Sequence, residues 1–132
     1  MIRSIRTSLS IILLAATFPW AGPALAASHA ADELVSLAIS GGKPVIADFG
    51  LGICMQCRNQ AETLERVRKA YGDKVTIRMV NVGKEADLAK RYEVELIPTL
   101  VFIDSKGKVV FRKVGPLGYE EIRTQLSRMG VQ

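Results

Sequence analysis

Apolar residues recur along this chain with two different spacings. An apolar run at 45–47 is typical of a short buried strand, and residues 75–82, rich in β-branched and apolar residues, predict a second strand. Between them, from about residue 54 to 71, apolar residues recur every three or four positions, which predicts an amphipathic helix. Because a helix separates the two strands, we expect them to be parallel. The inward positions of this helix are predicted to be Cys57, Ala61, Leu64, Val67, Arg68 and Tyr71.

The rest of the chain is predicted to add three helices and a hairpin. We expect helices over 28–40, 84–92 and 119–129, and a strand within 94–104 that returns from residue 109 after a turn at 105–108. Asp32 and Glu33 lie in the expected first turn of the first helix, and Gly41 and Gly42 end it. The length of 132 residues suits one domain of modest core size.

The first 27 residues differ from the rest in composition. Two arginines precede an uncharged, mostly apolar stretch, and small residues follow where a signal peptidase needs them. We therefore expect 1–27 to be a secretory signal peptide, cleaved near Ala26 or Ala27, and 28–132 to form the domain. An uncleaved membrane anchor fits less well, because the apolar core is short and prolines and a glycine interrupt it. The expected location is the periplasm.

The charge balance excludes some partners. The chain has 18 basic and 13 acidic residues, a formal net charge of +5. Arg3 and Arg6 belong to the expected leader, so the remaining 105 residues carry 16 basic and 13 acidic side chains, or +3. With no run of five like charges, nothing favours nucleic acid or an anionic membrane surface. His29, the only histidine, lies at the expected mature N-terminus, where we expect no general base.

The candidate chemistry lies in Cys54 and Cys57. They follow an apolar strand and a loop with Gly50 and Gly52, so Cys54 is expected at or just before a helix N-terminus. Unpaired backbone N–H groups and the helix dipole favour a thiolate there, so the pKa of Cys54 is expected below the ~8.5 of free cysteine. Cys57, one turn further on, is expected to be less accessible. Cys54 would then attack a disulfide, and Cys57 would resolve the mixed disulfide.

Other uses of two cysteines stay open. A structural disulfide closing so short a loop would constrain the unfolded chain very little. Structural zinc needs four ligands, and the chain offers no third cysteine and one histidine. A Cu(I) carrier using the two sulfurs is an alternative, because soft ligands select Cu(I) and Met55 lies between the cysteines. The leading expectation involves no metal and no cofactor.

Several motifs together resemble the thioredoxin-fold oxidoreductases over residues 28–132. Asp48-Phe49 precedes the Cys-Met-Gln-Cys motif at the family's spacing, and an Ile-Pro-Thr loop, 97–99, precedes the later apolar strand. Asn81, Gly107 and Gly115 match further family positions. The resemblance implies an α/β thioredoxin fold, a central mixed four-stranded sheet flanked by helices, with the helix at 28–40 as an N-terminal extra.

The resemblance also implies roles for individual residues. Pro98 would follow a cis peptide bond and lie against the disulfide, and a substrate strand would pair beside Cys54 through Ile97. Ile53 and Thr99 would be further substrate contacts. Asp48 would be buried with a raised pKa and would accept the proton of Cys57. The competing interpretations are an edge-strand proline at Pro98 and a partly exposed acid at Asp48.

This chain departs from the family pattern at four places. Ile53 replaces the tryptophan before the first cysteine, Gly50 replaces an aromatic residue, and Met79 is expected where a lysine often neighbours the buried acid. The dipeptide between the cysteines is Met-Gln rather than Gly-Pro. These departures leave the reaction class intact but affect the redox potential and the partner surface.

The direction of electron flow is predicted from two neighbours of the cysteines. Strong oxidants of this family carry a histidine between the cysteines, whereas Gln56 is neutral, and Ile97 precedes the proline as in reducing thioredoxins. We expect a monomeric periplasmic reductant or electron carrier of middling potential, with a dithiol oxidant as the alternative. Its partners would be client proteins with disulfides or oxidised cysteines. Electrons would come, by analogy, from a membrane conduit of the DsbD/CcdA type.

Overall fold

The computed structural model describes residues 32–132, and its helices and strands follow the predicted order. They are α1 (Glu33–Gly41), β1 (Val45–Gly50), α2 (Met55–Tyr71), the short 3₁₀ helix η1 (Gly72–Lys74), β2 (Thr76–Asn81), α3 (Ala86–Arg91), β3 (Thr99–Ile103), β4 (Val109–Val114) and α4 (Tyr119–Arg128). The predicted leader, its cleavage site and His29 lie outside the described residues. No helix within 32–132 combines the length and hydropathy needed to cross a membrane.

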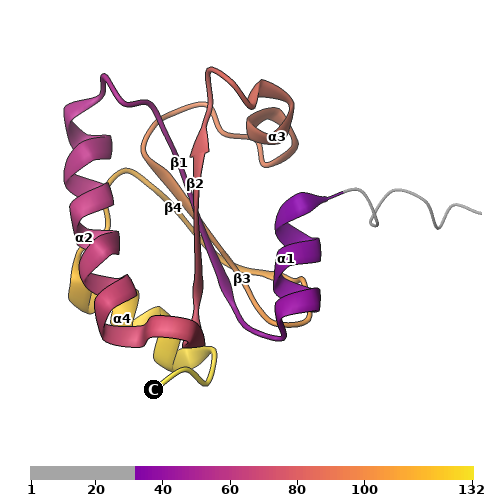
Figure 1. The fold of residues 1–132 in the computed structure, drawn as a ribbon. Coiled ribbons are helices and arrows are strands. Elements are labelled where there is room, and N and C mark those ends of the chain that lie inside the picture. The colour runs from indigo at the N-terminus through magenta and orange to yellow at the C-terminus, as the bar shows by residue number, and fades with distance from the viewer. Residues whose placement is uncertain (1–31) are drawn as a thin grey trace, which may run out of the picture.

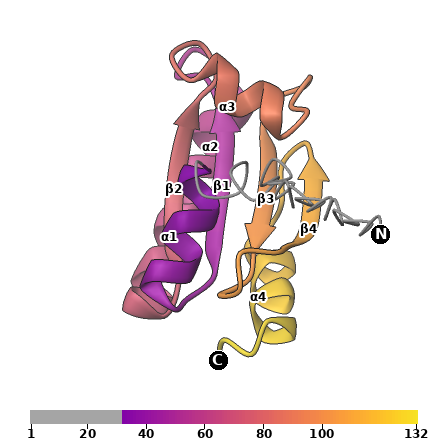
Figure 2. The ribbon, with the colours of Figure 1, turned by 90° about the vertical axis from the view of Figure 1, so that its right-hand side faces the viewer.

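The strands form one four-stranded sheet in the order β2-β1-β3-β4, which Figure 2 shows face on. β1 and β2 run parallel, as predicted, and Asp48 lies opposite Met79 in their register. β3 is antiparallel to β1, with Thr99 opposite Phe49, and β4 is antiparallel to β3. The predicted mixed sheet is therefore confirmed.

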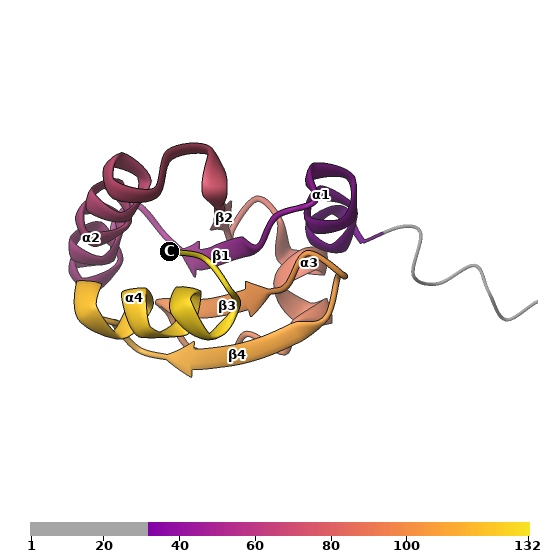
Figure 3. The ribbon, with the colours of Figure 1, turned by 90° about the horizontal axis from the view of Figure 1, so that it is seen from below.

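Helices cover both faces of the sheet. Figures 1 and 3 show α2 and α4 on one face and α1 and α3 on the other. Alternate residues of β1 face opposite sides, so Ile46 packs in the cluster that includes Leu64 of α2, whereas Ala47 packs in the cluster that includes Leu34 of α1. Asp48 has the same parity as Ile46. Its side chain is therefore directed to the face that α2 covers.

The first helix begins later than predicted. Asp32 is the N-cap of α1 rather than a first-turn residue, because its backbone is extended and its carboxylate accepts hydrogen bonds from the N–H groups of Leu34 and Val35. Gly42 ends the helix with φ of +60°, a left-handed conformation that favours glycine. The predicted stop at Gly41 and Gly42 is confirmed.

The inward face of α2 differs from the prediction at one turn. Its buried residues are Cys57, Gln60, Leu64 and Val67. Arg68, predicted to point inward, is exposed and pairs with Glu65 on the helix surface. The prediction for Arg68 was wrong because the buried face of α2 passes through Gln60, Leu64 and Val67, and Arg68 lies at the edge of that face.

The strand within 94–104 is shorter than the apolar run. β3 begins at Thr99 because sheet pairing starts there, opposite Phe49, and residues 92–98 form a loop. This loop carries Ile97 and Pro98 to the edge of the sheet where β1 ends. The start of α2 lies at that same end of the molecule, and the C-terminus lies at the opposite end, where Lys74 Nζ donates to the carbonyl oxygen of Gln132 at 2.6 Å (Figure 1).

Candidate functional site

Cys54 caps the N-terminus of α2. Its backbone is extended, and its Sγ accepts a hydrogen bond from the N–H of Cys57 at 3.2 Å. The pKa of Cys54 is lowered, chiefly because the Cys57 thiol donates a hydrogen bond to its sulfur. The backbone N–H groups of Cys57 and Gln56 and the positive charge of Arg58 act in the same direction. The predicted placement at the helix start is confirmed.

Cys57 lies one turn deeper and differs from Cys54 in both access and acidity. It is buried, whereas Cys54 is half-buried, and both are free thiols. Burial raises the pKa of Cys57 to about 11, and its hydrogen bond to Cys54 and the nearby negative charges of Cys54 and Asp48 act the same way. The two thiols therefore form an asymmetric pair with one accessible acidic sulfur and one buried basic sulfur.

Gly50 allows Cys57 to approach the end of β1. A Cβ at Gly50 would lie 3.1 Å from Cys57 Cβ and 3.2 Å from Cys57 Sγ, which is tighter than ordinary packing. A larger residue would force the cysteine or the strand to move. Gly50 is thus the place where the strand end and Cys57 lie closest, and it stands where the family pattern has an aromatic residue.

Asp48 is buried beneath the cysteine pair. Its exposed fraction is 1%, and neither carboxyl oxygen has a hydrogen-bond partner within the described part of the chain. Burial raises the pKa of Asp48 to about 6, because an ionised carboxyl loses its hydration there. The predicted burial and the predicted direction of the shift are confirmed, and the alternative of a partly exposed acid is wrong.

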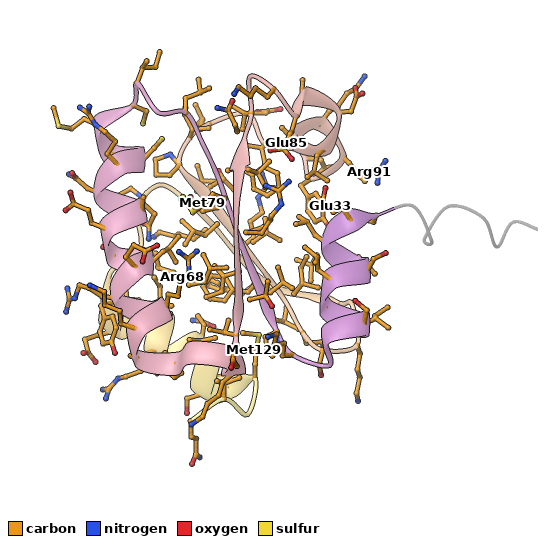
Figure 4. The ribbon with its side chains drawn as sticks, in the orientation of Figure 1. Glu33, Arg68, Met79, Glu85, Arg91 and Met129 are labelled. Carbon is orange, nitrogen blue, oxygen red and sulfur yellow. The ribbon has the colours of Figure 1, made fainter. Side chains whose placement is uncertain are left out.

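Asp48 and Cys57 line one cavity of about 200 Å³ between β1, β2 and the start of α2. Met79 of β2 lines it as well, directly opposite Asp48 in the sheet register. Figure 4 shows Met79 on the α2 side of β2. The thioether carries no charge, so this neighbour gives the Asp48 carboxyl no counter-ion.

Pro98 lies beside the same strand end. The Ile97–Pro98 peptide bond is cis, as predicted. Phe49 pairs with Thr99, so the register continued by one residue places Pro98 opposite Gly50, the residue in close approach to Cys57. The N–H of Gly115 donates to the Pro98 carbonyl oxygen at 2.8 Å. Because β3 pairs with β1 on one side and β4 on the other, the alternative of an edge-strand proline is wrong.

Comparison with known proteins agrees with this geometry. The thioredoxin family model matches residues 27–128. The chain belongs to the thioredoxin family. A thioredoxin of Alicyclobacillus acidocaldarius subsp. acidocaldarius is 34% identical over 96 residues, which cover 73% of this chain and 90% of that thioredoxin. The Fasciola hepatica thioredoxin structure has a TM-score of 0.64 at 30% identity, covering 71% of this chain and 88% of that one. The predicted thioredoxin fold is confirmed.

A second relative is larger. The Synechocystis thiol:disulfide interchange protein named TxlA homolog is 30% identical over 83 residues, which cover 61% of this chain and 46% of that protein. Thioredoxins are disulfide oxidoreductases that act on protein substrates with disulfides. With its adjacent Cys54 and Cys57, this thioredoxin-family protein is a thiol–disulfide oxidoreductase.

The residues predicted to contact substrate lie at different depths. Ile53 is 90% exposed beside Cys54, and Ile97 is half-buried in the loop before β3. Thr99 is buried, and its hydroxyl donates to the Leu96 carbonyl oxygen at 2.7 Å. Thr99 therefore shapes this loop from inside, which argues against the direct substrate contact predicted from the sequence.

Sequence reasoning missed residues that support or surround this thioredoxin site. Met55 at the first position of α2 and Leu96 in the loop before β3 add exposed apolar surface close to Ile53 and Ile97. The available signal was that each lies within two residues of one already predicted to contact substrate. Arg112 of β4 donates to the carbonyl oxygens of Tyr92 and Glu93 at 2.9 and 2.6 Å, which fixes the start of the loop before Pro98. No local pattern indicates that contact.

Proposed function

We propose that this protein is an exported dithiol reductant or electron carrier of middling potential that acts in the periplasm on protein disulfides. The observation that carries the proposal is the asymmetry of the thiol pair. Cys54, whose pKa is lowered, is accessible at the helix start, whereas Cys57, whose pKa is raised, is buried one turn deeper. Such a pair suits attack by the first sulfur and resolution by the second.

In the first step, the Cys54 thiolate attacks one sulfur of the substrate disulfide. A bond forms between Cys54 and that sulfur, the substrate S–S bond breaks, and the other substrate sulfur leaves as a thiolate that takes a proton from water. Ile97 pairs with the substrate chain beside Cys54, and the exposed Ile53 offers apolar contact. The lowered pKa of Cys54 favours the thiolate, which is the attacking form of the sulfur.

In the second step, Cys57 resolves the mixed disulfide, and Asp48 takes its proton. With a pKa of about 6, Asp48 is mostly ionised at neutral pH and can act as a base. Both groups line the cavity of about 200 Å³, which has room for water between them. The Cys57 thiolate attacks Cys54, the Cys54–Cys57 disulfide forms, and the second substrate sulfur leaves. Two electrons have then passed from the protein to the substrate.

The direction of electron flow rests on the neighbours of the pair. Gln56, between the cysteines, is neutral, and an isoleucine precedes Pro98. Neither supplies the positive charge that would stabilise the Cys54 thiolate strongly enough to make the disulfide a strong oxidant. A reductant in the periplasm needs electrons, and a membrane conduit of the DsbD/CcdA type would supply them.

Export is supported by the composition of residues 1–27, whose basic start, apolar stretch and small residues are typical of a cleaved leader. Expression of the full chain with cell fractionation and N-terminal sequencing tests it. The expected result is a periplasmic protein that starts just after Ala26 or Ala27. A full-length protein retained in the cytoplasm would contradict this part of the proposal.

Reduction of insulin disulfides by residues 28–132 tests the exchange chemistry. Cys54→Ser is expected to abolish turnover, and Cys57→Ser is expected to accumulate a mixed disulfide through Cys54. If Cys57→Ser trapped nothing while Cys54→Ser stayed active, the assigned roles would be wrong. The same trapping variant, applied to periplasmic extract, identifies the client proteins.

Equilibration of the protein with glutathione buffers tests the direction. We expect a potential between those of thioredoxin, about −270 mV, and protein disulfide isomerase, about −180 mV. A value near that of the strong oxidant of the bacterial periplasm, about −120 mV, would replace the reductant with the oxidant alternative.

A further inference from the structure

Gln60 is a buried polar side chain on the helix that carries the cysteines. Its exposed fraction is 1%, and it lies three residues after Cys57, one turn along α2, beside the apolar Leu64 and Val67. Burying a neutral amide costs free energy unless its donor and acceptor find partners. The partners of Gln60 therefore indicate what this residue does.

Both ends of the Gln60 amide bind the backbone of one residue. Nε2 donates to the Leu117 carbonyl oxygen at 3.2 Å, and Oε1 accepts from the Leu117 N–H at 2.7 Å, and both bonds are buried. The glutamine amide offers a donor and an acceptor side by side without carrying a charge at any pH, and asparagine is one methylene shorter. Gln60 thus fixes α2 to the segment between β4 and α4.

That segment is bound in turn to the loop before β3. Gly115, two residues before Leu117, donates its N–H to the Pro98 carbonyl oxygen at 2.8 Å. One path of contacts therefore runs from Cys57 along one helical turn to Gln60, then through Leu117 and Gly115 to Pro98. Its two ends are the resolving thiol and the loop that faces it.

We propose that Gln60 is a positioning residue for thiol–disulfide exchange with protein substrates, which it serves by holding the Ile97–Pro98 loop in place relative to the cysteine pair. This inference rests on the proposed pairing of a substrate chain with Ile97. Gln60 does not touch the reacting sulfurs. Its loss moves the loop and leaves the Cys54 environment, which belongs to the first turn of α2, unchanged.

The test compares a protein disulfide with a small aromatic disulfide that is too short to pair with the loop. Gln60→Met keeps the length and the helical character of the side chain but removes both hydrogen bonds to Leu117. We expect kcat/KM for insulin to fall about ten- to hundredfold, mainly through KM, because the loop is misplaced. The rate with the small disulfide and the pKa of Cys54 are expected to stay as in the wild type.

Val67→Ala is the matched control. Val67 is buried on the same face of α2, two turns further along, in the core cluster that also contains Leu117, but its side chain makes no hydrogen bond to that segment. The substitution opens a cavity and lowers stability, while the bonds of Gln60 remain. We expect unchanged kcat/KM for insulin, measured below the unfolding temperature of every variant. An equal loss in Val67→Ala would reduce the effect of Gln60 to general destabilisation and overturn the proposal.

A second variant covers the case in which Gln60→Met does not fold. Gln60→Glu has both a donor and an acceptor when protonated, but only acceptors when ionised. The ratio of the insulin rate to the small-disulfide rate is expected to recover at acidic pH and to fall at neutral pH. A ratio equal to that of the wild type at every pH would overturn the proposal. A wild-type protein that reduced neither substrate would instead refute the proposed function.

Discussion

Two aspartates on opposite faces of the sheet are both buried, and the structure treats them in opposite ways. Asp32, 8% exposed at the start of α1, accepts hydrogen bonds from the N–H groups of Leu34 and Val35 and from the Tyr92 hydroxyl at 3.0 Å. Asp48, 1% exposed at the end of β1, has no hydrogen-bond partner among the described residues. Asp32 therefore links α1 to Tyr92 by hydrogen bonds, whereas the Asp48 carboxyl makes no hydrogen bond to the described part of the protein.

The surroundings of the two carboxylates differ as much as their partners. Around α1, Arg78 bridges Glu33 at 2.8 Å and Glu85 at 2.5 Å, and Figure 4 shows the two glutamates close together between α1 and α3. Around Asp48, the facing residue is Met79, and the cavity of about 200 Å³ lies between the ends of β1 and β2 and the start of α2. The face with satisfied charges stabilises the fold, and the face with an unsatisfied charge carries the chemistry.

The largest difference between substitutions of the two aspartates is expected in the rate at which substrate is released from the mixed disulfide with Cys54. Asp48→Asn removes the base that takes the proton of Cys57, so release is expected to slow about hundredfold. Asp32→Asn makes the same chemical change on the other face and is expected to leave the rate unchanged. Mass spectrometry of quenched reactions with a disulfide peptide measures both. Equal release rates in Asp48→Asn and Asp32→Asn would show that Asp48 does not act as the base.

The second-largest effect is expected on the free energy of unfolding when Asp48 is replaced, and its sign follows from the raised pKa of Asp48. Burial raises the pKa of Asp48 from 3.8 to about 6, so the folded state binds the proton more tightly than the unfolded state. Below the unfolded pKa there is no penalty for ionisation, and this penalty grows as the pH rises until it passes the folded pKa. Relative to wild type, Asp48→Asn is expected to gain about 3 kcal/mol between about pH 3.5 and about pH 8. Urea unfolding at both pH values measures the gain, and a pH-independent difference would contradict it.

A smaller effect is expected when Asp48 receives a counter-ion. Met79→Lys places a positive charge opposite the carboxyl, which is expected to lower the pKa of Asp48 by about one unit because Met79 is partly open to solvent. The pH at which mixed-disulfide release reaches half its maximum is expected to fall equally. Met79→Gln, a neutral residue of similar length, is the control, and the same shift in both variants would exclude a charge effect.

The smallest effect is expected from the capping role of Asp32. Asp32→Ala removes the acceptor for the first N–H groups of α1 and is expected to cost about 1 kcal/mol of stability at neutral pH. Turnover of insulin is expected to stay unchanged because α1 lies on the face away from the cysteines. Thermal unfolding and the insulin assay together check this, and a loss of turnover without a loss of stability would contradict it.

The sequence alone predicts the parts of the site that depend on residues close together in the chain or on motifs of fixed spacing. The glycines after Phe49 and the helical spacing after Cys57 predicted that Cys54 lies at the start of α2, and the family resemblance predicted the burial of Asp48 and the cis bond before Pro98. These features depend on neighbouring residues and on motifs with fixed spacing.

Features that depend on distant contacts were missed. Gln60 is polar and was not assigned to the core, because its partner Leu117 lies 57 residues further along the chain. Arg68 was placed inward on helical spacing alone, although its charge keeps it at the surface. The start of β3 at Thr99 depends on pairing with Phe49, which no local pattern reveals.

The bond between Lys74 and Gln132 has a practical consequence for capturing clients. It holds the last residue at the end of the molecule away from the start of α2 (Figure 1). An affinity handle added after Gln132, or attachment of the protein to a bead through that end, would leave Cys54 facing the surrounding solution. The Cys57→Ser protein can therefore be immobilised in a defined orientation without blocking the sulfur that captures its targets.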